Sequence, residues 1–268
     1  MPHPPEVLKL LSGRGYSSIK YTSVKSLPAE LHIDAPDKFR AFYRVMQRYA
    51  ARLIFHDLSL HPEGAELSQL LHYASQSSTS EILETFENLG LVQQNENRFR
   101  FRFPTNLRIG DFLEWLVATV LQREFSVPVI TNVSLQGSKT GGDYDVLGNW
   151  LGKLLLVEVK SAPPKGIHNP EIATFLDRLR DILPDIAVFL VDTHLRVRDK
   201  IVLMFEEELI KANGIGSLKE MPINKIKGQV FELNHFIYIM NSKRDLKSNF
   251  RIVFRDYIRY NSPVKLFI

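Results

Sequence analysis

The spacing of hydrophobic positions along this chain predicts helices in its N-terminal third and alternating helices and strands after it. Residues 1–36 show no sustained periodicity, and we expect an irregular arm there. Residues 37–58 carry apolar side chains at helical spacing, which predicts a first helix. Two further helices are expected over 65–73 and after the Ser-rich turn 75–78. The last of them should end at Gly90, because glycine readily adopts the left-handed conformation of a helix end.

A strict alternation of Arg and Phe follows the third helix. Residues 98–103 read Arg-Phe-Arg-Phe-Arg-Phe, which predicts a strand with arginines on one face and phenylalanines on the other. The turn-forming residues 95–97 separate this strand from an apolar start at Leu91, so the whole segment predicts a β-hairpin. Its exposed face would present Arg98, Arg100 and Arg102.

Three helices followed by a hairpin resemble a winged helix-turn-helix, and the resemblance covers residues 37–104. It implies a mainly α domain that binds nucleic acid or another protein. The third helix would be the recognition helix, yet it contains Glu81, Glu84 and Glu87 and no Lys or Arg. Since acidic side chains are unsuited to a groove lined by phosphates, we expect nucleic acid to contact the hairpin arginines instead. Protein–protein contact, including dimerisation, stays open as the alternative.

The remaining pattern predicts an α/β domain over residues 105–268. Its elements begin in the order helix, three strands, helix, strand, which indicates a mixed sheet flanked by helices. The helices are expected over 109–124, 170–183, 198–212 and 245–260. The strands are expected over 129–135, 144–149, 153–159, 186–191 and 236–240. Residues 213–235 show no pattern that we interpret.

Charged residues directly follow the apolar run 154–157. Such a run is typical of a strand buried on both faces, so charges at its end indicate a function. Strand alternation places Glu158 and Lys160 on the same face, where a carboxylate and an ammonium can act at one site. Asp145 leads the preceding strand, after the glycine pair 141–142, which lets the backbone approach closely.

This ordered set resembles the PD-(D/E)xK nuclease superfamily, which includes restriction endonucleases and Holliday-junction resolvases. The family combines an acidic residue on one strand with Glu-x-Lys on the next, and a Glu on the preceding helix often joins them. Here the resemblance covers residues 109–192 and gives Glu114, Asp145, Glu158 and Lys160 as catalytic residues. It implies a restriction-endonuclease-like sheet and hydrolysis of phosphodiester bonds, in DNA rather than RNA. The family's proline is absent before the aspartate, and Asp143 stays open as the alternative ligand.

The resemblance also implies a divalent cation, Mg²⁺, with Mn²⁺ as its substitute. Asp145, Glu158 and Glu114 would supply the oxygen ligands that Mg²⁺ favours. The cation would polarise the phosphate and activate a water, and Lys160 would orient that water or stabilise charge on the phosphate. Two other classes stay open: a catalytically inactive nuclease fold that binds nucleic acid or aids assembly, and a winged-helix transcriptional regulator.

The last predicted helix carries a second basic surface. The net charge is only +4 over 268 residues, so a surface for nucleic acid must come from local clusters. Such a cluster recurs at every fourth residue opposite the apolar face of this helix, and we expect it to contact phosphates. Its members are Lys247, Arg251, Arg255 and Arg259.

The composition narrows the class of protein. A hydrophobic fraction of 44% suffices for a sizeable core, and the lack of cysteine excludes disulfides and thiolate metal sites. The N-terminus does not resemble a signal peptide, and no uncharged stretch is long enough to span a bilayer. We therefore expect a cytoplasmic protein without membrane contact. A homodimer stays open, because cutting both strands of a duplex usually calls for two active sites.

Overall fold

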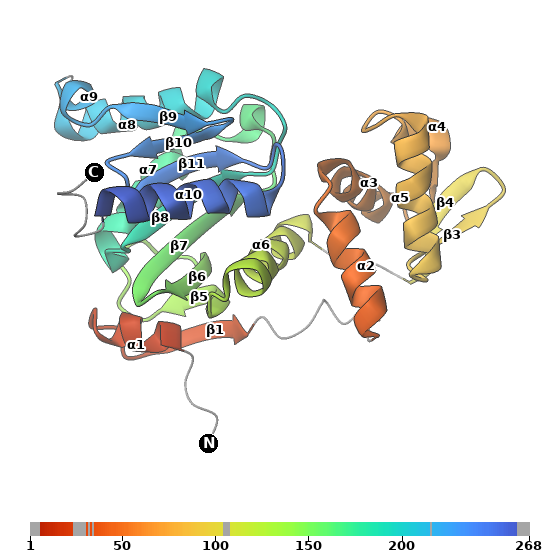
Figure 1. Ribbon diagram of the computed structural model, residues 1–268, viewed down its shortest axis with the longest axis horizontal. Helices are drawn as coiled ribbons and strands as arrows, with labels where there is room; N and C mark the ends of the chain where they lie inside the picture. Colours follow the sequence, from red (N-terminus) through yellow and green to blue (C-terminus); the bar gives the residue numbers. More distant parts are fainter. Residues whose placement is uncertain are drawn as a thin grey trace. The chain divides into compact units, whose positions relative to one another are not determined.

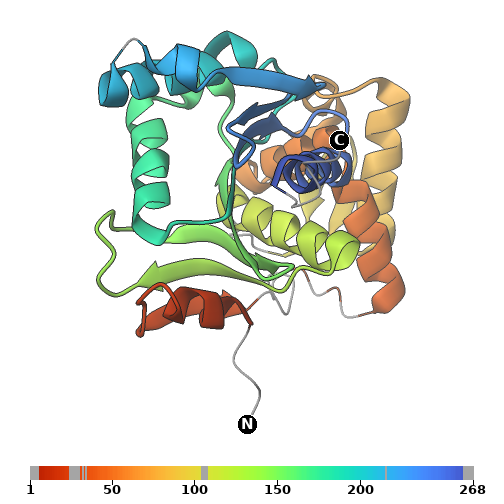
Figure 2. The ribbon, with the colours of Figure 1, turned by 60° about the vertical axis from the view of Figure 1, so that its left-hand side comes forward.

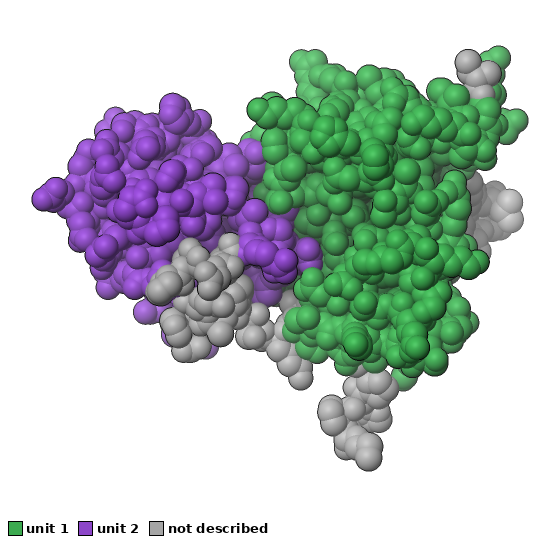
Figure 3. Space-filling view, turned by 180° about the vertical axis from the view of Figure 1, so that it is seen from behind, with its two compact units in different colours: residues 1–24, 117–268 green, residues 25–116 purple. Residues whose placement is uncertain are grey.

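The computed structural model describes residues 6–23, 31, 33, 35–103, 108–214 and 216–261. The chain divides into two compact units (Figure 3). Unit 1 comprises Met1–Val24 and Val117–Ile268, and unit 2 comprises Lys25–Leu116. These units do not coincide with the expected domains 37–104 and 105–268, because helix α6 (Ile109–Phe125) contributes residues to both of them.

Unit 1 is built on an eight-stranded mixed sheet in the order β1-β5-β6-β7-β8-β11-β10-β9. The strands are β1 (Ile19–Ser23), β5 (Val129–Leu135), β6 (Tyr144–Trp150), β7 (Lys153–Lys160), β8 (Ile186–Val191), β9 (Ile223–Lys227), β10 (Val230–Leu233) and β11 (Ile237–Asn241). β7, β8 and β11 are parallel, and every other neighbouring pair is antiparallel. The expected α/β class with a mixed sheet flanked by helices is thereby confirmed.

Helices cover both faces of this sheet (Figures 1 and 2). On one face α7 (Asn169–Ile182), α8 (Leu203–Asn213) and α1 (Glu6–Ser12) bury their apolar sides in a continuous core. On the other face α10 (Leu246–Asn261) packs through Phe254, whose ring stacks on Trp150 with centroids 4.2 Å apart. A short π-helix, Arg198–Val202, precedes α8, so the helix expected over 198–212 is present in two parts.

The N-terminal segment corrects the expectation of an irregular arm over 1–36. Within the described residues 6–23, α1 buries Val7 and Leu11, and β1 pairs antiparallel with β5, Ile19 lying opposite Leu135. Ile19 is half-buried and the rest of β1 is exposed. The strand therefore has no hydrophobic alternation to reveal it, and backbone pairing with a sheet edge fixes its place.

The uninterpreted segment 213–235 extends the sheet at its other end. It contains β9, β10 and the one-turn helix α9 (Ser217–Glu220). β10 is buried throughout but only four residues long, which is too short for its periodicity to be recognised in the sequence. None of the helices in the described parts of the chain is long and apolar enough to cross a membrane.

The helices of unit 2 differ in part from those expected. The single helix expected over 37–58 is two helices, α2 (Pro36–Met46) and α3 (Tyr49–Leu60), because Arg48 has an extended backbone between them. The buried guanidinium of Arg52 donates a hydrogen bond of 2.7 Å to the Met46 carbonyl. This bond satisfies an acceptor at the C-terminal end of α2.

The helix expected over 65–73 is mostly wrong. Residues 65–66 form strand β2 (Ala65–Glu66), and only one helical turn, α4 (Leu67–Leu70), follows it. The third helix is confirmed as α5 (Gln76–Asn88), although it begins within the expected turn 75–78. The hairpin of β3 (Val92–Asn95) and β4 (Arg98–Phe101) is confirmed as well, although β4 ends before residue 103. β2 joins this hairpin as the third strand of a small sheet. That pairing is not local in sequence, which explains why periodicity alone assigned residues 65–66 to a helix.

Candidate active site

Asp145 and Glu158 come together where the antiparallel ladder of β6 and β7 ends. Val146 pairs with Val157, so the next residue on each strand, Asp145 and Glu158, lies opposite the other. Asp145 contacts β7 through its side chain, because its Oδ2 accepts a hydrogen bond of 2.7 Å from the Val159 amide. The end of the ladder thus fixes two carboxylates side by side.

Glu158 is the most deeply buried of the predicted site residues, with 3% of its surface exposed. Burying an ionised carboxylate is costly unless cations and hydrogen-bond donors surround it. Both oxygens of Glu158 contact such groups: Oε1 lies 3.0 Å from Lys160 Nζ, and Oε2 lies 2.5 Å from Arg178 Nη1. Lys160 in turn lies 3.3 Å from Oε2 of Glu171. The predicted Glu–Lys pair is therefore part of a four-residue charge network.

Two members of this network, Glu171 and Arg178, were not predicted from the sequence. Both belong to α7 and lie two helical turns apart, so both face the end of β7. A signal for Arg178 exists, because it shares the buried face of α7 with Phe175 and Ile182, where an arginine is rare. Glu171 carries no such signal, since a carboxylate in the first turn of a helix is common.

Besides Glu158, Arg178 contacts the ring of Tyr144 and lies close to Gly142. Its guanidinium carbon lies 5.4 Å from the ring centroid of Tyr144, whose hydroxyl donates a hydrogen bond of 2.8 Å to Asp181 Oδ2. Gly142 has a φ of +72°, and a Cβ atom there would come within 3.2 Å of Arg178 Nη2. The positive φ favours glycine at this position, and a larger residue would also meet the guanidinium in a tight contact.

The electrostatics of the site indicate a shortage of positive charge. Burial, followed by the charge of Glu158, raises the pKa of Asp145 to about 7, although the Val159 amide and the cations Lys160 and Arg178 act in the opposite direction. Burial disfavours the ammonium form of Lys160, but attraction to Glu158, and less to Asp145 and Glu171, outweighs it and raises the pKa of Lys160. Lys160 therefore stays protonated and positively charged, whereas Asp145 readily binds a proton or another cation.

The two aspartates that the sequence left open as ligands lie in different surroundings. Asp145 lies beside Glu158, whereas Asp143 is exposed and precedes the start of β6. Glu114 is partly buried on the N-terminal half of α6, which belongs to unit 2, whereas the other predicted catalytic residues belong to unit 1. Its place in the site therefore stays a prediction.

Two carboxylates at the end of β6 and β7 fit a hard divalent cation in their chemistry. In the part of the chain that the structure describes, no group of three or more His, Asp or Glu side chains is arranged to hold a metal ion. Mg²⁺, however, is commonly bound by one or two carboxylates that leave places for water and substrate phosphates. A cation bound there would also offset the burial and the repulsion from Glu158 that together raise the pKa of Asp145.

The arginines predicted to contact nucleic acid from the hairpin are all exposed. Phe99 between them is buried, as the alternation predicts. Arg98 lies 3.4 Å from Glu66, and Arg102 Nε donates a hydrogen bond of 3.1 Å to the Val92 carbonyl. These contacts occupy some of the guanidinium N–H donors of the hairpin. Binding of nucleic acid by Arg98, Arg100 and Arg102 stays a prediction.

The basic residues predicted on the last helix are not equivalent. Lys247 forms an ion pair with Glu124, so its charge is partly compensated. Arg251, Arg255 and Arg259 are exposed. Arg255 and Arg259 also line a hollow of about 360 Å³ between α10 and β9. The uncompensated charges of the predicted stripe therefore lie toward its C-terminal part, and their contact with phosphates stays a prediction.

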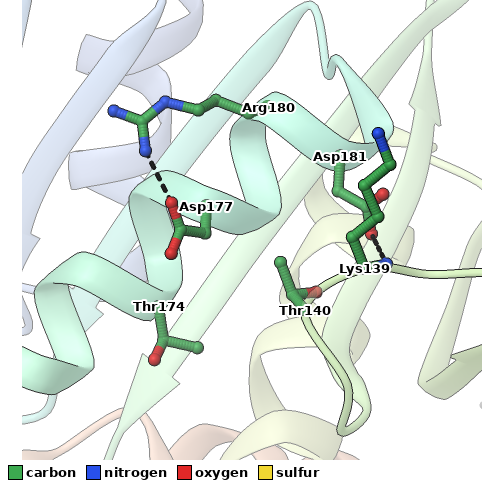
Figure 4. A pocket seen from close by; sticks show the side chains of 6 residues that line it. All are labelled: Lys139, Thr140, Thr174, Asp177, Arg180 and Asp181. Carbon is green, nitrogen blue, oxygen red and sulfur yellow. Dashed lines mark hydrogen bonds and ion pairs between the residues drawn. The ribbon is translucent and has the colours of Figure 1, made fainter.

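A polar hollow of about 380 Å³ lies along the flank of α7 (Figure 4). Thr174, which lines it, is one turn from both Glu171 and Arg178 on that helix. Its charges largely balance, because Asp177 pairs with Arg180 at 2.6 Å. The lining residues are Lys139, Thr140, Thr174, Asp177, Arg180 and Asp181.

Comparison with known proteins concerns the fold alone. No protein-family model and no curated protein sequence matches this chain. Among solved structures, the chain is similar to protein VC1899 from Vibrio cholerae, with a TM-score of 0.53 and 15% sequence identity. The likeness covers 94% of this chain and 62% of VC1899, so the chain spans less than two thirds of that protein.

Proposed function

We propose that this chain is a divalent-cation-dependent nuclease that hydrolyses phosphodiester bonds, in DNA rather than RNA. The observation that carries the proposal is the convergence of Asp145, Glu158 and Lys160 at the end of β6 and β7. Their order along the chain is that of the PD-(D/E)xK superfamily. A buried carboxylate, a second carboxylate with a raised pKa and an ammonium are the side-chain types that metal-assisted phosphodiester hydrolysis uses.

The arrangement of elements supports the same proposal. The order helix, three strands, helix, strand, which the sequence led us to expect, is present as α6, β5, β6, β7, α7 and β8. In this view unit 1 is a restriction-endonuclease-like domain. Unit 2, with its helices and three-stranded sheet, is a winged-helix-like module that helps to bind the substrate. Fold alone does not define activity, so the proposal depends on the site residues.

Each residue has a distinct role in this proposal. Asp145 and Glu158 would hold Mg²⁺ or Mn²⁺, with Glu114 as a further predicted ligand. The bound cation would supply a Lewis acid that polarises the phosphate and lowers the pKa of a water. Lys160, fixed 3.0 Å from Glu158, places its ammonium where it can donate to the attacking water or to a phosphate oxygen. The Val159 amide keeps Asp145 oriented toward the site.

A cleavage assay with matched variants tests the function. Branched, single-stranded and duplex DNA and the corresponding RNA are incubated with the protein and Mg²⁺, Mn²⁺ or EDTA. We expect cation-dependent cleavage of DNA, with a loss of roughly 10²-fold or more in Asp145→Asn, Glu158→Gln and Lys160→Met. The exposed neighbour Asp143 provides the control, and Asp143→Asn should cleave like the wild type. Cleavage that survives all three substitutions, or that proceeds in EDTA, would exclude this site.

A second candidate function has one observation in its favour. Both oxygens of Glu158 already contact cationic side chains, as expected of a nuclease fold that has lost catalysis and retains binding. In that case the protein binds nucleic acid with equal affinity in EDTA and in Mg²⁺ and cleaves none of the substrates. The same assay separates the two functions when binding and cleavage are measured on the same samples.

A further inference from the structure

Arg178 has more hydrogen-bonding capacity than its observed contacts use. A guanidinium carries five N–H donors in a planar fork. Among the described residues, Nη1 contacts Glu158, and the buried Nε has no hydrogen-bond partner. Buried polar groups are rarely left without a partner, and this arginine sits at the end of the strands that carry the two carboxylates. Its spare donors therefore suggest a ligand.

Besides its ion pair with Glu158, uncharged groups hold the guanidinium of Arg178 in place. Gly142 leaves room for Nη2, and the Tyr144 ring lies under the guanidinium. Tyr144 is itself anchored by Asp181, which also accepts hydrogen bonds from Ser138 Oγ at 2.6 Å and from Tyr16 at 2.9 Å. A preorganised planar fork of donors is the side chain best suited to a phosphate group.

Among the described residues, Glu158 is the one carboxylate within ion-pair distance of Arg178, although the charge of Arg178 also acts on Asp145. Oε2 of Glu158 lies 2.5 Å from Nη1 of Arg178. In the proposed function the same carboxylate is a ligand of the divalent cation. A cation bound there and the guanidinium would compete for the same oxygen, and the cation would repel the positive charge of Arg178. The guanidinium would then be free for an anion next to the cation.

We propose that Arg178 is a phosphate-binding residue of the site. When no divalent cation is bound, the Arg178 guanidinium is paired with Glu158. When a cation binds the Glu158 carboxylate, the guanidinium binds a phosphate oxygen of the substrate instead. The inference rests on the proposed function for the nature of the substrate. It adds a residue that lies outside the predicted set and gives it a role that can be measured without cleavage.

Binding of Mn²⁺ alone, measured by isothermal titration calorimetry at pH 8, tests the competition. Removal of the competing guanidinium in Arg178→Met should lower the dissociation constant for Mn²⁺ roughly tenfold, the effect of about 1.4 kcal/mol. Arg180 lies on the same helix and pairs with Asp177 instead, so Arg180→Met should leave the affinity unchanged. A residue that merely supported Glu158 would give the opposite sign, because its loss would weaken Mn²⁺ binding.

Binding of an oligonucleotide in Ca²⁺ tests the phosphate contact. A fluorescein-labelled DNA strand is titrated with protein in Ca²⁺ and in EDTA, and anisotropy gives the affinity whether or not the protein cleaves. Wild type should bind more tightly in Ca²⁺, and Arg178→Met should lose most of that gain, about tenfold. Arg178→Lys should lose part of it, because an ammonium lacks the planar fork.

The outcomes separate this inference from the proposed function. Weaker or unchanged Mn²⁺ binding in Arg178→Met, or no Mn²⁺ binding by the wild type, overturns the role of Arg178. An unchanged Ca²⁺-dependent affinity for DNA overturns it as well. Absence of cleavage by the wild type, with both expected changes in binding, overturns the nuclease and leaves the arginine role intact. If Arg178→Met fails to fold, Arg178→Lys must show both changes to a smaller degree, and an unchanged Arg178→Lys overturns the inference.

Discussion

Replacement of Asp145 by Asn should stabilise the folded protein in the absence of divalent cations. The folded-state pKa of Asp145 is raised from its ordinary 3.8 to about 7, first by burial and then by Glu158. A carboxyl with a raised pKa is favourable to folding only while it is protonated. It therefore costs stability as the pH rises from about 4 to about 7, and the cost is constant above that window. Asn keeps an oxygen that accepts from the Val159 amide and removes the charge.

The size of this effect follows from the pKa values. The interval from 3.8 to about 7 corresponds to about 4 kcal/mol at about 1.4 kcal/mol per pH unit, which is the ceiling for the cost at pH 8. At pH 5.5 the cost is about half as large, because the folded state is still protonated there. Lys160 and Arg178 can shift toward Asp145 when it ionises. We therefore expect gains of about 2 kcal/mol at pH 8 and about 1 kcal/mol at pH 5.5 for Asp145→Asn.

Urea unfolding in EDTA at these two pH values measures the gain. Each unit has one tryptophan, Trp150 in unit 1 and Trp115 in unit 2, so a Trp115→Phe background makes the fluorescence report on the unit that contains Asp145. Asp143→Asn is the control, because that side chain is exposed, and its stability should equal that of its parent at both pH values. A gain that does not increase with pH, or a loss of stability in Asp145→Asn, would refute the reasoning.

Two further predictions concern the glycine turn and the basic helix. Gly142→Ala should lower the free energy of unfolding by about 1–2 kcal/mol, because alanine is strained at a positive φ and its Cβ would meet Arg178. Gly141 also has a positive φ but has open space around it, so Gly141→Ala should lower the free energy of unfolding less. The comparison uses urea unfolding, and equal losses would contradict the role of the guanidinium contact. Arg255→Gln should reduce the slope of log affinity for DNA against log salt concentration by about one, the loss of one phosphate contact. Lys247→Gln should change it less, because Lys247 is paired with Glu124, and anisotropy titrations at several salt concentrations would detect the reverse order.

The part of the site that the sequence predicts is the part that depends on local pattern. An apolar run that ends in Glu158 and Lys160 can be recognised from neighbouring residues, and the structure places the two side chains 3.0 Å apart on one face of β7. Arg178 comes twenty residues after Glu158, and its contact depends on how α7 packs on the sheet. Hydrophobic periodicity predicts that α7 packs there, but not which polar residue of the helix meets which strand end.

The difference between local pattern and remote contact also explains which strands were predicted. β5 and β8 lie within the expected bounds, because their own side chains alternate or form a continuous apolar run. β1 and β2 were missed, since each is held by pairing with a strand remote in sequence: β1 with β5, and β2 with β4. Strand pairing of this kind contributes backbone hydrogen bonds and leaves little trace in the pattern of side chains.

The charges around Glu158 lead to a last prediction, on the effect of Mg²⁺. Three carboxylates, Asp145, Glu158 and Glu171, share two cationic side chains, Lys160 and Arg178. When Asp145 ionises, the network lacks one positive charge, and a divalent cation would supply it and leave an excess that attracts phosphate.

A cation that binds only the folded state stabilises it by mass action. At 10 mM Mg²⁺ and a dissociation constant on the order of 1 mM, wild type should gain about 1.4 kcal/mol at pH 8. Asp145→Asn should gain much less, because it lacks the charge deficit, and Asp143→Asn should gain as much as wild type. Urea unfolding with and without Mg²⁺ gives these values. Equal stabilisation of all three proteins would place the cation elsewhere and remove the electrostatic basis for a metal site at the end of β6 and β7.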